Sequence, residues 1–183
     1  MTDNSRHAIL LAARRAFARN PYADVTLRGI AADAGVSASL IVKHFGGKES
    51  LFDKVADFED AATALLDAPN EELGRCAVRA IVQFRRDNNA DLLLRVVFAL
   101  GVGAERAMLR ERFRRQVVQQ VAARLTGEDV PLRAELFVAQ LIGLGAALAV
   151  DREGPAATAD VEQIADLYAP ALQSLVNARQ IAR

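Results

Sequence analysis

Hydrophobic residues recur every three to four positions along almost the whole chain, which is the spacing of amphipathic helices. Ile9, Ala13 and Phe17, for example, share one face of a helix over about residues 4–19. No stretch shows the sustained alternation of apolar and polar residues that is expected of a strand. We therefore predict an all-α protein of about nine helices.

Prolines, glycines and capping residues divide this pattern into segments. Thr26 and Ser37 stand where N-caps are expected, and Gly35 follows the segment between them as a C-terminal stop that can take a positive φ. A longer helix is expected from Lys48, because buried-type residues follow at helical spacing as far as Leu65. The predicted helices cover 4–19, 27–34, 38–44, 48–65, 71–87, 90–102, 104–126, 131–151 and 160–179.

Composition restricts the class of protein. The chain has 183 residues, of which 52% are hydrophobic and 25% charged, so it is neither disordered nor of low complexity. A single cysteine, Cys76, rules out a disulfide framework and suits a reducing compartment. The charge-free apolar run between Glu135 and Asp151 holds 15 residues, whereas a membrane span needs about 20. We expect a soluble, cytoplasmic protein without a membrane partner.

The net charge is zero, but the charges are not evenly distributed. Residues 1–50 carry seven Lys/Arg and four Asp/Glu, a balance of +3, while residues 51–183 carry sixteen and nineteen, a balance of −3. A small basic module on a neutral or acidic body is typical of nucleic-acid binding, although the asymmetry alone is weak support. We place the domain boundary after residue 50. Residues 1–50 are expected to form a DNA-binding domain, and residues 51–183 a helical domain for effector binding and dimerisation.

Residues 26–52 have the layout of a helix-turn-helix, with a glycine in the three-residue turn. Its second helix is short enough to enter a major groove. The side chains expected to point partly outward are Ser37, Ala38, Ser39, Val42 and Lys43. Lys43, His44 and Lys48 add donors for phosphates near the end of that helix.

The residues that carry a specific resemblance are Thr26-x-Arg28-x-Ile30-Ala31-x-x-Ala34-Gly35-Val36-Ser37, followed by His44-Phe45-x-x-Lys48-Glu49-x-Leu51. This pattern resembles the DNA-binding head of the tetracycline-repressor (TetR) family over residues 6–55. The resemblance implies an all-helical homodimer that regulates transcription, usually as a repressor, with a ligand-sensing body. It also favours DNA contacts by Thr26, Arg28 and His44.

Two positions depart from the family pattern. Many members have glycine at the place of Ser39 and tyrosine at the place of Val42, where the tyrosine commonly touches phosphate. Val42 cannot donate a hydrogen bond, so Lys43, His44 or Ser39 must supply the backbone contact instead.

The body predicts a subunit interface. Residues 132–150 are apolar around much of the helix and must be buried on more than one side. Together with the stripe on 160–179 they would form a four-helix dimer interface. Residues 133–144 and 169–173 are also similar to C-terminal domains of actinobacterial TetR members. The expected interface residues are Leu136, Gln140, Gly143, Ala147, Ile164, Tyr168, Ala171 and Leu175.

A small, largely apolar effector is expected between helices of the body. Most of the large apolar residues there are expected to belong to the core, and one or two of them to line an effector cavity. The candidates are Phe84, Val97, Phe98, Met108 and Phe113.

The leading hypothesis is a repressor that a small ligand releases from a pseudo-palindromic operator. The alternative is a constitutive DNA-binding dimer without an effector, which the sequence cannot separate from the first. An enzyme is disfavoured, because the chain lacks a Gly-rich phosphate loop, a nucleophile elbow and a histidine pair. Neither histidine has a partner at metal-ligand spacing, so we expect no metal site and no cofactor.

Overall fold

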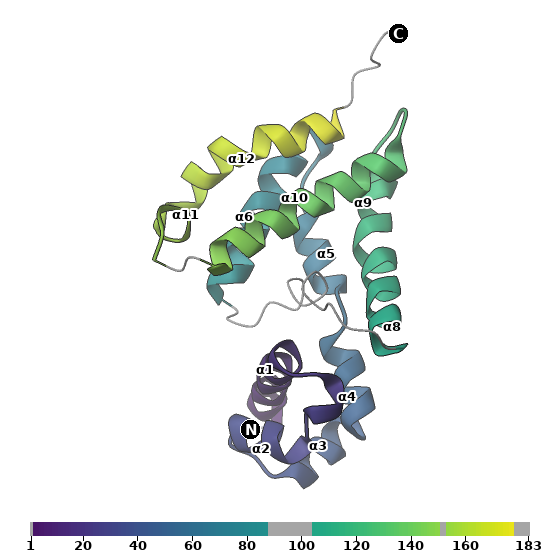
Figure 1. Ribbon diagram of the computed structural model, residues 1–183, viewed down its shortest axis with the longest axis vertical. Coiled ribbons are helices and arrows are strands. Elements are labelled where there is room, and N and C mark those ends of the chain that lie inside the picture. Colours follow the sequence, from purple (N-terminus) through teal and green to yellow (C-terminus); the bar gives the residue numbers. More distant parts are fainter. Residues whose placement is uncertain (1, 88–103, 151–152, 178–183) are drawn as a thin grey trace. The chain divides into compact units, whose positions relative to one another are not determined.

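The computed structural model describes residues 2–87, 104–150 and 153–177 (Figure 1). Every regular element in these ranges is a helix, which confirms the all-α prediction. The predicted helix over 90–102 lies outside the described residues. Within the described residues the chain divides into two compact units, 2–57 with 104–109 and 58–87 with 110–150 and 153–177.

Residues 2–57 of the first unit contain four helices that surround a small apolar core. They are α1 (Thr2–Arg19), α2 (Leu27–Ala34), α3 (Ala38–Phe45) and α4 (Lys48–Val55), with a short 3-10 turn, η1 (Tyr22–Asp24), after α1. The helix α1 packs against α2 and α4, and α3 packs against α2 and α4. Fully buried side chains at the centre include Ile9, Phe17, Ile30, Ile41 and Leu51.

Local capping determines where α2 and α3 begin and end, as the sequence predicts. The Thr26 hydroxyl accepts a hydrogen bond from the Gly29 N–H (3.1 Å), and the Ser37 hydroxyl accepts one from the Leu40 N–H (3.2 Å). Gly35 ends α2 in the left-handed region, with φ 65°. The turn between the two helices is therefore held by residues within it.

The single long helix expected from Lys48 is wrong, because the structure has two helices there. After α4, the backbone leaves the helical region at Ala56, and α5 (Glu59–Leu65) begins anew. The Phe58 N–H donates to the side-chain Oε1 of Gln116 (3.1 Å) instead of continuing the helix. The apolar stripe was identified correctly, since Val55, Phe58 and Leu65 are all buried.

The second unit begins with α5. After η2 (Asn70–Glu72) come α6 (Leu73–Asp87), α8 (Ala104–Phe113), η3 (Arg114–Val118), α9 (Gln119–Arg124), α10 (Val130–Val150), α11 (Pro155–Thr158) and α12 (Val161–Val176). The boundary between the two units falls within α8, after Leu109. The segments α8, η3 and α9 follow one another without a break, and η3 is a π-helical turn within them. The short helix α11 was not predicted.

Helices α6 and α12 lie side by side in this unit (Figure 1). A Cβ atom on Gly74 would stand 2.8 Å from the backbone nitrogen of Gln173 and 2.9 Å from the carbonyl oxygen of Ala169. Only glycine allows this approach without displacing the backbone of α12. The Gly74 N–H, which starts α6 and has no helical partner, donates to Gln173 Oε1 (2.8 Å).

A buried guanidinium joins the start of α10 to the end of α12. Arg133, in the first turns of α10, is 7% exposed and donates to four backbone carbonyls. Two are at the end of α12, Leu175 (2.9 Å) and Val176 (2.9 Å), and two are in the turn before α10, Thr126 (2.7 Å) and Glu128 (2.8 Å). The charge suits the C-terminal end of α12, where unpaired carbonyls concentrate negative potential.

The helix α10 is long and apolar enough, by length and composition alone, to cross a membrane. A core helix of a soluble protein passes the same test. Eight of its 21 residues are buried, including Arg133, which is hydrogen-bonded to the protein. Packing against other helices of this unit accounts for the buried apolar face of α10.

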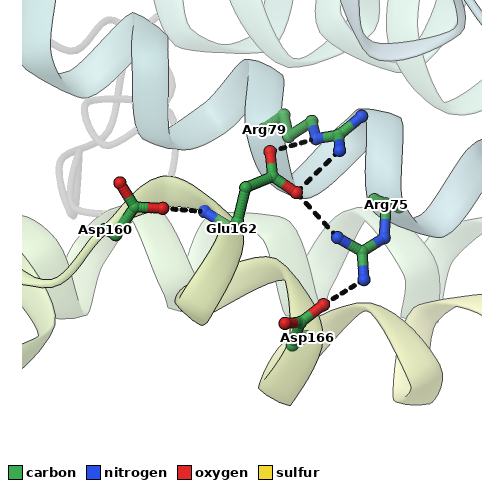
Figure 2. Close-up of polar contacts among 5 residues, drawn as sticks. All are labelled: Arg75, Arg79, Asp160, Glu162 and Asp166. Carbon is green, nitrogen blue, oxygen red and sulfur yellow. Dashed lines mark hydrogen bonds and ion pairs between the residues drawn. The ribbon is translucent and has the colours of Figure 1, made fainter.

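On the outer side of the α6–α12 pair, arginines of α6 bind carboxylates of α12 (Figure 2). Arg79 bonds Glu162 through Nε (2.7 Å) and Nη2 (2.6 Å), and Arg75 bonds both Glu162 (2.8 Å) and Asp166. The hydrogen bond from Arg79, reinforced by charge attraction from both arginines, holds the pKa of Glu162 below its usual value. Asp160 caps α12 by accepting from the Glu162 N–H (2.8 Å).

Replacing the buried guanidinium tests its structural role. We expect Arg133→Met to lower the free energy of unfolding by about 2–4 kcal/mol, because it leaves buried carbonyls without donors. Thermal or urea unfolding measures the difference. The exposed Arg114 provides the control, and Arg114→Met should change stability by less than about 0.5 kcal/mol. Equal effects of the two substitutions would contradict the assignment.

The ion pairs of Glu162 with Arg75 and Arg79 predict that the stability of the fold depends on pH. Because the folded-state pKa of Glu162 is lowered, the stability that its carboxylate contributes is fully present above the unfolded-state pKa. This stability is lost as the pH falls through the folded-state pKa. Glu162→Gln should therefore lower Tm at pH 7, and the difference from wild type should shrink below about pH 4. Glu135→Gln, at an exposed position of α10, is the control. A Tm difference that stays constant down to about pH 3 would rule out the ionised pair as its cause.

Candidate nucleic-acid interface

The helix α3 has one face in the core of the first unit and one face in solvent. Ile41 is fully buried and Phe45 is 8% exposed, whereas Val42 is 48% exposed. Ser39 and Lys43 are also exposed, and Ala38 is half-buried. The residues that the sequence predicts to point outward therefore lie on the accessible side of α3. A helix of this kind can enter a major groove.

Two serines at the start of α3 are hydrogen-bonded to each other. Ser37 Oγ and Ser39 Oγ are 2.9 Å apart, and Ser37 Oγ also accepts the capping bond from Leu40. Either hydroxyl can act as the donor of the pair. Ser37 is thus a cap first, and Ser39 presents the more accessible lone pairs.

His44 is only partly available for a phosphate. It is half-buried, its ring lies 6.2 Å from that of Phe45, and its Nε2 atom is enclosed without a hydrogen-bond partner among the described residues. A contact with DNA would therefore have to use Nδ1. The sequence predicts a phosphate contact by this residue but could not indicate that one of its nitrogens is covered.

Thr26 and Arg28 are both exposed at the beginning of α2. Thr26 is occupied by its capping bond to Gly29. Arg28 lies two residues further on and is the charged residue of the two. The pattern of a capping hydroxyl followed by an exposed cation is compatible with the predicted contact to a phosphate.

Lys48, the first residue of α4, is half-buried. Its Nζ stands 4.3 Å from the centroid of the Tyr22 ring and donates to the carbonyl oxygen of Ala23 (3.3 Å). The ammonium is thus held against η1, and within the described residues it is not paired with a carboxylate.

One cation near α3 was missed by sequence reasoning. The guanidinium of Arg6, on α1, lies 5.7 Å from the centroid of the Phe45 ring at the end of α3. Arg6 is exposed. Arg6 and Phe45 are 39 positions apart and belong to no common motif. Only the packing of α1 against the other helices of the first unit brings this charge beside α3.

The residues predicted for the subunit interface fall into three groups according to their exposure. Leu136 (45% exposed), Gly143, Ala147 and Ala171 are exposed, while Gln140, Tyr168 and Leu175 are half-buried. Ile164 lies in the core of its own unit instead, at 8% exposed. The Tyr168 hydroxyl donates to the carbonyl oxygen of Gln140 (2.9 Å), and burial raises the pKa of Tyr168.

Other exposed apolar residues extend the same two helices. Leu132 is 55% exposed and Val150 83% on α10, and Leu167 is 81% exposed on α12. On α10 the exposed positions 132, 136, 139, 143, 147 and 150 recur at helical spacing and form one stripe. A solvent-facing apolar stripe of this kind is typical of an interaction surface.

The predicted ligand-pocket residues do not come together in one described cavity. Val97 and Phe98 lie outside the described residues, as does the side chain of Met108. Phe113 is 7% exposed and packs edge-on against Phe58, with 5.2 Å between ring centroids, and Phe84 is half-buried. A groove of about 660 Å³ between α5 and the segment formed by η3 and α9 is lined by other residues, among them Glu59, Asp67, Arg115 and Arg124. Its mixed charges do not match an apolar ligand.

Within the described residues, no group of three or more His, Cys, Asp or Glu side chains is placed to hold a metal ion. Cys76 is half-buried, and burial, with a contribution from Asp67, raises the pKa of its thiol. A thiol with a raised pKa is a weak nucleophile.

Comparisons with known proteins agree with this geometry. Residues 9–55 match the family described as bacterial regulatory proteins, tetR family, and residues 71–176 match the tetracyclin repressor-like, C-terminal domain. A TetR-family regulator from Streptomyces coelicolor A3 is 31% identical, with 95% of each chain covered and a TM-score of 0.58.

Two further relatives are more limited. The transcriptional repressor AcnR of Corynebacterium glutamicum is 48% identical over 59 residues, which span 32% of this chain and only 31% of the repressor. The transcriptional regulator FadR of Bacillus subtilis, solved in complex with stearoyl-CoA, shares the fold with a TM-score of 0.67 at 14% identity, over 96% of this chain and all of that one. The two family matches and the full-length relative lead to one conclusion: this chain belongs to the tetR family of bacterial regulatory proteins.

Proposed function

We propose that this protein is a cytoplasmic, homodimeric transcriptional repressor that binds a pseudo-palindromic DNA operator. The observation that carries the proposal is the helix-turn-helix of the first unit, in which α3 is capped at Ser37 and exposes Ser39, Val42 and Lys43. In a two-fold dimer, two such helices would enter successive major grooves about 34–36 Å apart.

The proposed DNA contacts are of two kinds: contacts to phosphates, which position the protein on the duplex, and contacts to base edges, which read the sequence. Arg28, Lys43 and Lys48 would bind phosphates, and Thr26, Ser37 and His44 would add hydrogen bonds to the backbone. Ala38, Ser39 and Val42 face the base edges, where a valine side chain suits the methyl group of thymine. This division places affinity largely in the cations and specificity in the small side chains of α3.

The dimer would form through α10 and α12. Their exposed apolar stripe includes Leu136, Gly143, Ala147 and Ala171, whose small or branched side chains allow two helices to approach closely. Burying the stripe against a second copy removes from water a surface that a monomer would expose. The same contact explains the apolar outer face of α10 without a membrane.

Release by a small ligand in the second unit completes the proposal, with Phe84, Val97, Phe98, Met108 and Phe113 still the predicted lining. The ligand would act through unequal affinity for DNA-bound and free forms of the dimer. The alternative is a constitutive DNA-binding dimer. A thermal-shift screen with apolar compounds separates them, because only a binding protein is stabilised as ligand concentration rises. We assign no cofactor and no catalytic role.

The first experiment measures DNA binding by fluorescence anisotropy at two salt concentrations. The probe is a short duplex from the promoter beside the protein's own gene, with an unrelated duplex of equal length as the control. We expect saturable binding that survives competitor DNA for the first probe only. Equal, weak binding of both duplexes would contradict a specific regulator of that promoter.

Removing one phosphate contact should act on all sequences alike. We expect Lys48→Ala to weaken binding to both duplexes and to reduce the salt dependence of log K by about 0.9 per head, or about 1.8 for a dimer. Lys54→Ala, at an exposed position of α4, is the matched control. An unchanged salt slope in the Lys48 variant would exclude it as a phosphate ligand.

A charge placed on the apolar stripe should separate the subunits. Leu136→Glu is expected to convert the dimer to a monomer in analytical ultracentrifugation at micromolar concentration, because a buried carboxylate without a partner is costly. Ala123→Glu, an exposed position of α9 outside the stripe, should leave the dimer intact. If the Leu136 variant sediments as wild type, the interface lies elsewhere.

A further inference from the structure

We propose that Tyr22 is a positioning residue for DNA binding, which holds the ammonium of Lys48 in place for a phosphate of the operator. The inference rests on the proposed function and goes beyond it, because it assigns a role to a residue in the turn after α1 that lies outside the helix-turn-helix motif.

The geometry consists of two contacts on one ammonium. Nζ of Lys48 stands 4.3 Å from the centroid of the Tyr22 ring, within the range of a cation–π interaction. The same Nζ donates to the carbonyl oxygen of Ala23 at 3.3 Å. Both partners belong to η1, some 25 residues earlier in the chain, so the long lysine side chain is restrained by tertiary structure.

The ring itself is fixed by the core of the head. Tyr22 stacks on Phe17, with 5.7 Å between centroids and 12° between ring planes, and meets Phe52 edge-on at 5.1 Å and 75°. Phe17 and Phe52 also contact each other at 5.0 Å. Both phenylalanines are almost completely buried. The face of Tyr22 is therefore a rigid platform and not a mobile surface group.

The chemistry of the two contacts leaves the charge of Lys48 available. A ring face and a carbonyl oxygen attract a cation without neutralising it, whereas a carboxylate would compete with phosphate. Among the described residues no carboxylate lies within ion-pair distance of Nζ. An ammonium has three N–H donors, and the carbonyl accepts one. A restrained and uncompensated cation loses less conformational freedom when a phosphate arrives.

The competing explanation is that Lys48 only joins η1 to α4 and contributes to folding. It predicts that Tyr22 and Lys48 variants change stability and that DNA affinity follows stability alone. If Tyr22 positions Lys48, replacing the Tyr22 ring should change DNA affinity only when Lys48 is present. This difference should persist among variants of equal stability.

The experiment is a double-mutant cycle on the full-length protein, with anisotropy at two salt concentrations and thermal unfolding of each variant. The variants are Tyr22→Phe, Tyr22→Leu, Lys48→Ala and the double variant Tyr22→Leu/Lys48→Ala. We expect Tyr22→Phe, which keeps the ring face, to bind within about twofold of wild type. Tyr22→Leu should weaken binding about three- to tenfold, and should have no effect in the Lys48→Ala background.

A further variant separates electrostatics from packing. Pentafluorophenylalanine at position 22 keeps the shape of the ring but removes the negative potential on its face, so it should weaken DNA binding as Tyr22→Leu does while the head stays folded. It serves in place of Tyr22→Leu if leucine lowers the Tm of the head.

The outcomes are distinguishable. If the wild type binds and Lys48→Ala weakens binding, but the leucine and fluorinated variants bind as wild type, Tyr22 does not position the lysine. Additive losses in the cycle overturn the inference as well, because they indicate independent structural effects. If the wild type binds neither duplex at either salt concentration, the proposed function itself fails, and the inference fails with it.

Discussion

The arrangement of the second unit depends on the guanidinium of Arg133. It is buried without a carboxylate and is satisfied by four carbonyl oxygens, two from the end of α12 and two from the turn before α10. Charge-assisted bonds to carbonyls that have no helical partner offset the desolvation of the cation and of the helix end together. Because the two helices it joins carry the exposed apolar stripe, this side chain holds the start of α10 against the end of α12 beneath the surface that we propose as the dimer interface.

A second polar network joins α12 to η2, α6 and α9. Arg124 bonds the Leu66 carbonyl and Asn70 Oδ1, and Asn70 returns a bond to the Arg124 carbonyl. Gln173 joins this group by donating to the Asn70 carbonyl and accepting from Gly74. The C-terminal ends of α5 and α9 and the start of α6 are therefore satisfied by side chains from neighbouring elements.

Features whose cause is local could be predicted from the sequence, and features that need a distant partner could not. Thr26, Gly35 and Ser37 act within three or four residues, and their caps lie where the pattern placed them. The break after α4 depends on Gln116, which bonds Phe58 from 58 positions away. For the same reason the sequence gives no sign that His44 Nε2 is covered or that Ile164 belongs to the core. The outward residues of α3 were predictable because helical periodicity and the turn together fix which side is buried.

The π-helical turn η3 has a consequence for insertions and deletions in this chain. Its hydrogen bonds span five residues where an α-helix spans four, so the helix from Ala104 to Arg124 holds one extra residue in that turn. Loss of a single residue between Arg114 and Val118 would let this turn close as a regular α-helix, because the wide turn accommodates its extra residue with almost the same total rotation. Val121, which is fully buried, would then keep its direction relative to the residues before the turn. A one-residue deletion in the regular part of the helix would instead rotate the residues on one side of it by about 100° relative to those on the other side. The π-helical turn is therefore the place where this helix accommodates a change of length.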